Sequence, residues 1–134
     1  MKRRKTTRTA TFKIAYPPTK EGKAQWNKRY GLNAYYSGKA WQARKRDAEY
    51  WHMLTRAAIK ESIPRPVMFD KPVEFTYWFN SKLDLSNCSS YVKLIEDGTK
   101  GIIIEDDNRK YVKRINMLWH NEDYILVQIK EIDT

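Results

Sequence analysis

The chain has 134 residues, a length that fits one domain of ordinary size with a single hydrophobic core. Its 41% hydrophobic and 13% aromatic content is typical of a globular protein, and no apolar run approaches the ~18 residues of a membrane span. The net charge of +10 favours nucleic acid as partner, because each neutralised phosphate releases counterions. A solvated basic surface, or a protein of the ribosome or of a membrane surface, could carry the same charge.

The single cysteine and the basic N-terminal residues indicate the cellular compartment and the domain boundaries. Cys88 has no second cysteine for a disulfide, and no apolar signal segment follows the first basic residues, so we expect a cytoplasmic protein. Residues 1–9 carry five basic side chains and no apolar residue beyond Met1. We therefore predict a mobile basic arm over 1–9 and one domain over 10–134.

The first part of that domain predicts a strand and a long basic loop. Phe12, Ile14 and Tyr16 alternate on one face of a strand over 11–16, which two prolines end. Residues 19–36 lack a helix or strand period and mix cations with aromatic side chains, which suits base stacking beside phosphate contacts. Aromatic side chains also build cores, so those of this loop could face either DNA or the core. The aromatic residues are Trp26, Tyr30, Tyr35 and Tyr36, and the candidate DNA-binding cations are Lys20, Lys23, Lys28 and Arg29.

A run without glycine or proline predicts a long helix over 39–62, with Ser37 as its N-cap. Trp51, Leu54 and Ala58 recur at helical spacing and form its apolar side. Its outer face carries further cations that could contact DNA phosphates. These are Arg44, Lys45 and Arg46.

The second half of the chain predicts a strand, a helix and two more strands. Alternating apolar residues mark a strand over 72–79, and an apolar stripe at helical spacing marks a helix over 85–97. Alternation returns over 115–119 and 125–129, with 120–123 as the turn of a closing hairpin. The expected fold is α+β, a single domain with a mixed β-sheet of about four strands and two helices in the order β-α-β-α-β-β.

An acidic stretch interrupts this basic chain. It holds six of the 16 carboxylates: Asp84, Glu96, Asp97, Glu105, Asp106 and Asp107. Carboxylates gathered on a protein that otherwise attracts polyanions indicate a hard divalent cation, Mg²⁺ or alternatively Mn²⁺, bound together with substrate phosphates. The isolated histidines argue against zinc, and the lack of a glycine-rich phosphate loop argues against a nucleotide cofactor.

Each acidic residue also has a purely structural interpretation. Asp84 could cap the helix that follows it. Asp97 could end that helix beside Gly98, or pair with Lys93 one turn earlier. The run 106–108 is typical of a turn. The order of these residues and their basic surroundings favour a metal site over these alternatives.

A fixed order of polar residues extends through this stretch. It consists of D-L-S-N at 84–87, Lys93, E-D-G at 96–98, Gly101 and E-D-D-N-R-K-Y-V at 105–112. This order resembles the signature of the RusA family of Holliday-junction resolvases, which runs D-x-D-N, a lysine, an acid with a small residue, a glycine, then D-D, a polar turn and a valine. The prolines after the first strand, the basic loop and the long helix also match, so the resemblance covers nearly the whole chain.

The resemblance implies a homodimeric, Mg²⁺-dependent endonuclease that resolves four-way DNA junctions in recombination and repair, often carried by prophages. By position, Asp84 and Asp107 match metal ligands, and Asp106 matches the acid beside the latter. Lys93 matches the lysine near the scissile phosphate, and Asn87 matches the asparagine of the first motif. The resemblance thus implies Asp84, Lys93 and Asp107 as catalytic residues.

The sequence departs from this signature at two places. Lys93 follows the asparagine by six residues instead of the three of the shortest members, an insertion of nearly one helical turn that keeps it on the same face. Ser86 replaces the second aspartate, and its hydroxyl can ligate Mg²⁺ but removes one charge, for which Glu105 or Asp97 could compensate. Two rival classes therefore stay open: a junction-binding protein that has lost cleavage, and a generic basic binding module with structural acids.

Overall fold

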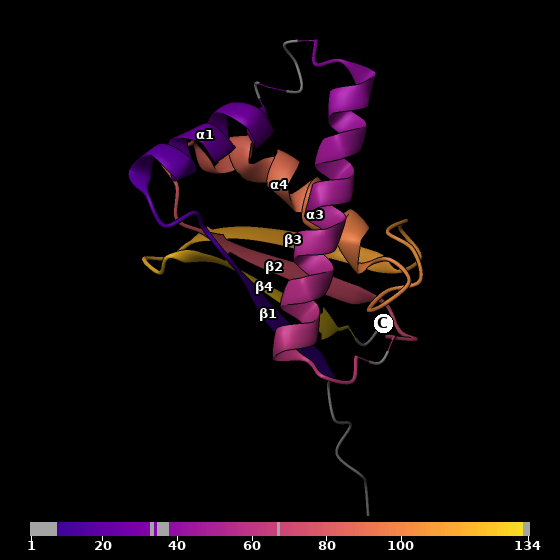
Figure 1. The fold of residues 1–134 in the computed structure, drawn as a ribbon. Coiled ribbons are helices and arrows are strands. Elements are labelled where there is room, and N and C mark those ends of the chain that lie inside the picture. The colour runs from indigo at the N-terminus through magenta and orange to yellow at the C-terminus, as the bar shows by residue number, and fades with distance from the viewer. Residues whose placement is uncertain (1–7, 33, 35–37, 67, 133–134) are drawn as a thin grey trace, which may run out of the picture.

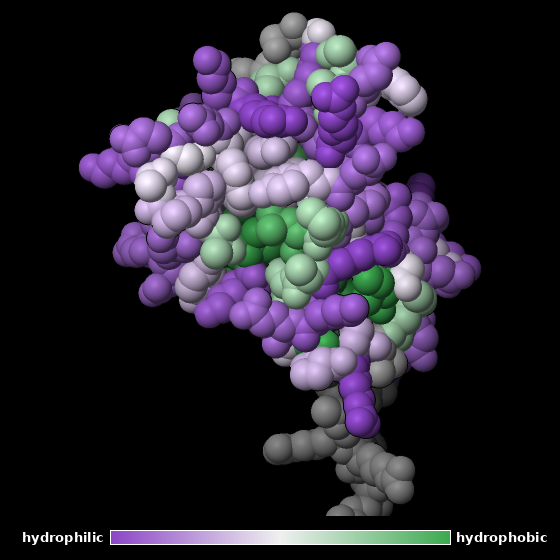
Figure 2. Space-filling view, viewed as in Figure 1, coloured by the Kyte–Doolittle hydropathy of each residue, from purple (hydrophilic) through white to green (hydrophobic). Residues whose placement is uncertain are grey.

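A four-stranded sheet with helices on one of its faces forms the protein (Figure 1). This computed structural model describes residues 8–32, 34, 38–66 and 68–132. The face of the molecule drawn in Figure 2 is mainly hydrophilic, as expected from a content of 31% charged residues, with a hydrophobic area near its centre.

The sheet has the strand order β1-β4-β2-β3. The strands are β1 (Thr9–Ala15), β2 (Val73–Phe79), β3 (Val112–Trp119) and β4 (Tyr124–Glu131). β4 runs antiparallel to both of its neighbours, whereas β3 runs parallel to β2 and forms one edge. The predicted hairpin between the last two strands is wrong, because β2 separates them. The alternation of apolar residues along a strand indicates which of its side chains are buried. It does not indicate which other strand pairs with it.

Three α-helices and one 3₁₀ turn are described besides the strands. They are α1 (Lys20–Tyr30), α3 (Trp41–Ser62), η1 (Leu85–Cys88) and α4 (Ser89–Thr99). The prediction of a loop over 19–36 is wrong for α1, whose first turn is capped by the Thr19 hydroxyl accepting from the Gly22 N–H at 3.0 Å. The predicted cap Ser37 lies outside the described residues. The side chain of Asp84 makes no capping hydrogen bond.

These elements confirm the predicted fold class, an α+β domain with a mixed four-stranded sheet, although α1 adds a helix to the two expected. Of the predicted basic arm, residues 1–7 lie outside the described residues, and β1 already begins at Thr9, paired with Lys130. No helix in the described part of the chain is long and apolar enough to cross a membrane.

Aromatic side chains of α1 and α3 meet in the core. Trp51 is fully buried and stands edge-on to Trp26, with ring centroids 4.9 Å apart, and to Tyr30 at 5.4 Å. Such edge-to-face contacts stabilise the packing of α1 against α3. Trp26 and Tyr30 therefore pack in the core, while Tyr35 and Tyr36 lie outside the described residues.

A glycine allows α3 and α4 to approach closely. A Cβ added to Gly98 would lie 2.8 Å from the Cβ of Thr55, closer than side-chain atoms pack. Glycine is therefore required here, and the contact fixes the second half of α4 against α3.

Candidate functional site

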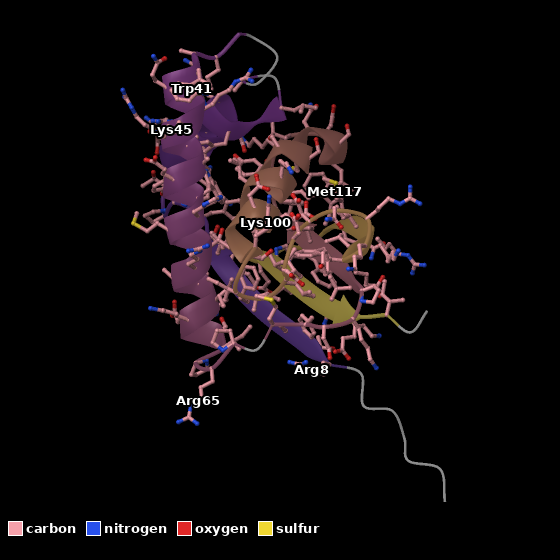
Figure 3. All side chains as sticks on the ribbon, turned by 90° about the vertical axis from the view of Figure 1, so that its right-hand side faces the viewer. Arg8, Trp41, Lys45, Arg65, Lys100 and Met117 are labelled. Atoms are coloured by element: carbon pink, nitrogen blue, oxygen red, sulfur yellow. The ribbon has the colours of Figure 1, made fainter. Side chains whose placement is uncertain are left out.

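The second half of α4 and the loop after it gather carboxylates around two lysines. Lys93 Nζ lies 2.8 Å from Asp107 Oδ2 and 3.3 Å from Asp97 Oδ1. Lys100 Nζ, at the end of α4 in Figure 3, lies 3.3 Å from the same Asp97 oxygen and 3.4 Å from Asp107 Oδ1. Asp106 is more distant, 4.0 Å from Lys100. We call these five side chains the acid–lysine cluster.

Local backbone geometry explains why this cluster forms. Lys93 and Asp97 are one turn apart on α4, so their side chains meet. Gly101 has a φ of +80°, which lets the chain turn back after α4. The Asp106 carboxylate accepts the N–H of Asp107 at 2.8 Å and so shapes the turn that presents Asp107. The helical ion pair and the acidic turn, considered above as structural alternatives, are thus both part of this site.

An open pocket of about 490 Å³ lies beside the cluster, between α4 and the first half of β3. Its lining consists of Lys93, Glu96, Asp107, Arg109, Val112, Lys113, Arg114 and Ile115. Glu96 is only 6% exposed, and no hydrogen bond or ion pair joins its carboxylate to another described residue. Basic side chains outnumber acidic ones in the lining, so the pocket can attract a phosphate to the carboxylates.

The pocket shifts the pKa values of its two carboxyl groups in opposite directions. Burial, followed by the Asp107 charge, raises the pKa of Glu96 to about 7. The hydrogen bond from Lys93 holds the pKa of Asp107 well below its usual range, and it raises the pKa of the Lys93 ammonium in turn. Near neutral pH the pocket therefore contains one carboxyl that exchanges a proton and one that stays ionised.

The first motif of the predicted metal site lies at the other end of α4. Asp84, Ser86 and Asn87 lie between the end of β2 and the start of α4, and both Asp84 and Ser86 are exposed. Asp107 precedes β3, and because β3 is parallel to β2, it lies at the opposite end of the strands. α4 has 11 residues, a length of about 16 Å.

This arrangement corrects the expectation that Asp84 and Asp107 share one ion, which one chain does not allow. Neither Ser86 nor Asp84 reaches the acid–lysine cluster, so Asp106 and Asp107 are separated from the other predicted ligands. Among the described residues, no three His, Cys, Asp or Glu side chains are grouped so as to hold a metal ion. Lys93 and Asp107, both predicted as catalytic, do meet.

Two of the cations predicted to touch DNA, Arg29 and Lys23, form ion pairs with acidic side chains. Arg29 Nη2 lies 3.1 Å from an oxygen of the fully buried Asp47, which Lys39 also contacts. Lys23 pairs with Asp123 at 3.0 Å. Arg29 therefore neutralises a buried charge. The other predicted DNA-binding cations are all exposed, namely Lys20, Lys28, Arg44, Lys45 and Arg46.

Trp41 is an exposed aromatic residue that the sequence patterns do not single out. It begins α3, is 70% exposed and has Lys45 Nζ 5.6 Å from its ring centre. Figure 3 shows both side chains at the end of α3 that is far from Arg65. An exposed indole beside a cation can stack on a base while the cation contacts a phosphate.

Lys100 and Glu96 are site residues to which the motif comparison assigns no role. Lys100 follows Asp97 at the spacing of a helical ion pair, so that spacing was a usable signal. Glu96 belongs to the acidic stretch and to the motif order, but its burial in the pocket is not suggested by a charged residue type. The basic rim of the pocket depends on β3 passing beside α4, and no local pattern reveals that arrangement.

Comparison with known proteins adds no family. A scan against protein-family models finds none that matches, and no curated protein matches the sequence. The resemblance to the RusA family therefore rests on the sequence features described above, without support from a matching family model or curated protein.

Proposed function

We propose that the protein is a structure-selective, Mg²⁺-dependent endodeoxyribonuclease that acts on four-way DNA junctions in the cytoplasm, as the resemblance to the RusA family implies. The observation that carries this proposal is the contact of Lys93 with Asp107. These two residues, predicted to act together at the scissile phosphate, lie 2.8 Å apart in an open pocket with a basic rim.

The distribution of charge supports DNA as the substrate. The chain carries a net charge of +10, and three further cations, Arg109, Lys113 and Arg114, line the pocket beside Lys93. A phosphate drawn there would meet the Lys93 ammonium, which can stabilise negative charge on its oxygens. The exposed pair of Trp41 and Lys45 offers a second point of contact at the far end of α3.

The carboxylates of one chain do not fit a Mg²⁺ ion by themselves. Both oxygens of Asp107 face ammonium groups, Oδ2 that of Lys93 at 2.8 Å and Oδ1 that of Lys100 at 3.4 Å. Asp97 is shared by the same two lysines. An ion would have to displace these groups, and Asp84 lies at the other end of α4. We therefore assign no ion to a single chain.

Junction binding without cleavage is a second candidate function. It is favoured by the separation of Asp84 from Asp107 and by the neutral hydroxyl of Ser86, which replaces a carboxylate of the family signature. Wild type and Ser86→Asp together separate the two candidates. If cleavage is the function, the wild type nicks with Mg²⁺ and restoring this carboxylate is expected to raise the nicking, whereas a protein that has lost cleavage through Ser86 shows no nicking as wild type.

A labelled four-way junction and a plain duplex of the same length test both candidates. With Mg²⁺, the endonuclease is expected to nick the junction symmetrically, to leave the duplex intact, and to lose activity in Asp107→Asn. Glu49→Gln, an exposed acid on α3, serves as the matched control and should retain activity. Preferential binding of the junction without nicks supports the second candidate. Equal affinity for junction and duplex at fixed salt would contradict both, because backbone charge alone gives little preference.

A further inference from the structure

One face of the β-sheet is covered by the helices, and the other face is not covered by any described element (Figure 1). Successive side chains of a strand point to opposite faces. On the helix side, the central strands bury their side chains almost completely, as with Phe75 of β2 and Val127 of β4. On the other side, most side chains are half-buried or exposed. We call that side, which carries Trp78 and Gln128, the open face.

One end of the open face carries aromatic and aliphatic side chains. Trp78 of β2 lies in register with Leu126 of β4 and with Leu118 of β3. Tyr124 precedes Leu126 by two residues, so it lies diagonally from Trp78, and such neighbours are about 7–8 Å apart. Leu118 is 45% exposed, and the two aromatic side chains are half-buried. Aromatic residues on adjacent strands of an uncovered four-stranded sheet can stack unpaired bases.

A row of hydroxyl and amide groups crosses the open face next to this aromatic end. Gln128 of β4 is in register with Thr11 of β1 and Thr76 of β2, and Asn116 of β3 completes the row. Asn116 Nδ2 donates to the Thr76 hydroxyl at 3.1 Å. No hydrogen bond joins the Gln128 side chain to another described residue. Because an amide both donates and accepts, Gln128 can pair with the edge of an exposed base.

Cations border the aromatic end and the polar row. The charged side chains of the open face are Lys13, Lys130, Arg114 and Glu74. Lys13 Nζ lies 5.1 Å from the centre of the Tyr124 ring. Arg114 pairs with Glu74 at 3.4 Å, an exposed ion pair that a phosphate can replace. Three cations against one acid complement a polyanion, whereas the core of a protein–protein interface is depleted of charged residues.

We propose that the open face is a second DNA-binding surface, on which single-stranded DNA stacks its bases on Trp78 and Tyr124. The phosphates of the strand contact Lys13 and Lys130. Duplex DNA cannot bind in this way, because its bases are already stacked on one another. Apart from Arg114, which borders both, the open face shares no residue with the pocket beside the acid–lysine cluster. The inference goes beyond the proposed function and rests on it only in the choice of DNA over RNA.

The stacking contact is tested by fluorescence anisotropy with a labelled oligothymidine of about 12 nucleotides. EDTA is present, so that no strand is cut. Trp78→Ala is expected to weaken binding about 10-fold or more, since it removes one stacked base, whereas Trp78→Phe keeps a ring and should bind within about 3-fold of the wild type. Trp119→Ala is the matched control, because Trp119 is 46% exposed on the helix side of β3. Equal affinities of Trp78→Ala and Trp119→Ala overturn the inference.

The phosphate contacts are tested by the salt dependence of binding, which does not depend on a change in the aromatic end. Lys13→Ala with Lys130→Ala is expected to lower the slope of log K against log salt by about 1.4, or about 0.7 for each phosphate contact. Lys60→Ala with Arg65→Ala, at two exposed cations near the end of α3, is the control and should leave the slope unchanged. Equal slopes in the two double variants overturn the inference.

Photocrosslinking locates the bound strand without any substitution in the protein. An oligothymidine with 5-iododeoxyuridine at its centre is irradiated in the complex, and the attached peptides are identified by mass spectrometry. Crosslinks to Trp78 or Tyr124 are expected. Crosslinks only to Trp41, which is 70% exposed at the start of α3, would place the strand elsewhere and overturn the inference.

Two further results would assign the open face to another partner. Tighter binding of oligouridine RNA than of oligothymidine overturns the choice of DNA. A dimer in light scattering that Trp78→Ala dissociates, without affinity for single strands, means that a second copy covers the face. If junctions are nicked but single strands do not bind there, the inference fails and the proposed function stands. Binding of single strands that Trp78→Ala removes, without any nicking, supports the inference and contradicts the proposed function.

Discussion

Two aspartates of this protein are each held between two cationic side chains, yet in opposite surroundings. Asp47 of α3 is fully buried, with Arg29 3.1 Å from one oxygen and Lys39 against the other. The Tyr30 ring lies 5.6 Å from the Arg29 guanidinium and 5.5 Å from the Lys39 ammonium. Arg29 belongs to α1, so the Asp47 pairs connect α1 to α3.

Asp107, in contrast, faces an open pocket. Its side chain is 16% exposed, and that of its main partner Lys93 is 65% exposed. Exposed ion pairs contribute little to stability and can exchange partners, whereas a buried carboxylate depends on the cations that it has. The comparison indicates that Asp47 stabilises the fold, while Asp107 is available to a ligand.

The largest expected effect is the loss of stability in Asp47→Ala. This change leaves Arg29 and Lys39 close together without the carboxylate between them, and should lower the free energy of unfolding by about 2–4 kcal/mol. Urea unfolding followed by tryptophan fluorescence measures the change. Glu49→Ala, an exposed acid on the same helix, should shift it by less than about 0.5 kcal/mol. If Asp47→Ala and Glu49→Ala lowered the free energy of unfolding equally, Asp47 would not stabilise the fold in the way that distinguishes it from Asp107.

Glu96→Gln should change how stability depends on pH. The folded pKa of Glu96 is raised to about 7 from an ordinary 4.5, so the folded state holds its proton longer than the unfolded chain does. Glu96 therefore makes its full contribution to the free energy of unfolding below about pH 4.5. This contribution, roughly 1–3 kcal/mol, is lost as pH rises through about 7. Between pH 4 and pH 8, the urea midpoint of Glu96→Gln should vary less with pH than that of the wild type. An unchanged slope would show that Glu96 is ionised throughout.

Replacing one lysine beside each aspartate compares the buried surroundings of Asp47 directly with the open pocket of Asp107. Lys39 is 15% exposed, contacts Asp47 and donates to the Arg29 carbonyl at 2.7 Å. Lys39→Ala should therefore cost about 1–2 kcal/mol of unfolding free energy. Lys100→Ala, at a 36% exposed side chain, should cost no more than about 0.5 kcal/mol in the same urea titration. A larger loss from Lys100→Ala would mean that the acid–lysine cluster is structural.

Asp107→Asn should have the smallest effect on stability. The folded pKa of Asp107 is lowered, so its contribution is present above the unfolded value near 4 and is lost as pH falls below it. Because its partners are well exposed, the loss at pH 7 should stay below about 1 kcal/mol, although the proposed function predicts that the same variant loses nicking. Thermal unfolding at pH 7 checks this, and a loss as large as that of Asp47→Ala would make the inactivity a folding defect.

Elements with a strong apolar period could be predicted from the sequence. The predicted bounds of β2 and α3 agree with the structure to within about two residues. α1 could not be found in this way, because its core contacts are two aromatic side chains among lysines, held by Trp51 of a different helix. Strand pairing was also out of reach, since the neighbours of a strand depend on elements far away in the chain.

The same limit applies to the candidate site. Lys93 and Asp107 belong to one motif order and do come together. Asp84 belongs to that order as well, but a linear motif does not state at which end of a helix each member lies. The basic rim of the pocket and the role of Lys100 follow from tertiary contacts of β3 and of the loop after α4, so only the structure reveals them.

The central place of β4 also determines when this protein can fold during synthesis. β4 is the last of the four strands to leave the ribosome, and it alone connects β1 to β2 in the described sheet. It brings Ile125, Val127 and Ile129, which are fully buried. Until β4 emerges, β2 can pair only with β3, and the apolar face of β1 stays open to chaperones and aggregation. The nascent chain is therefore expected to fold late and cooperatively.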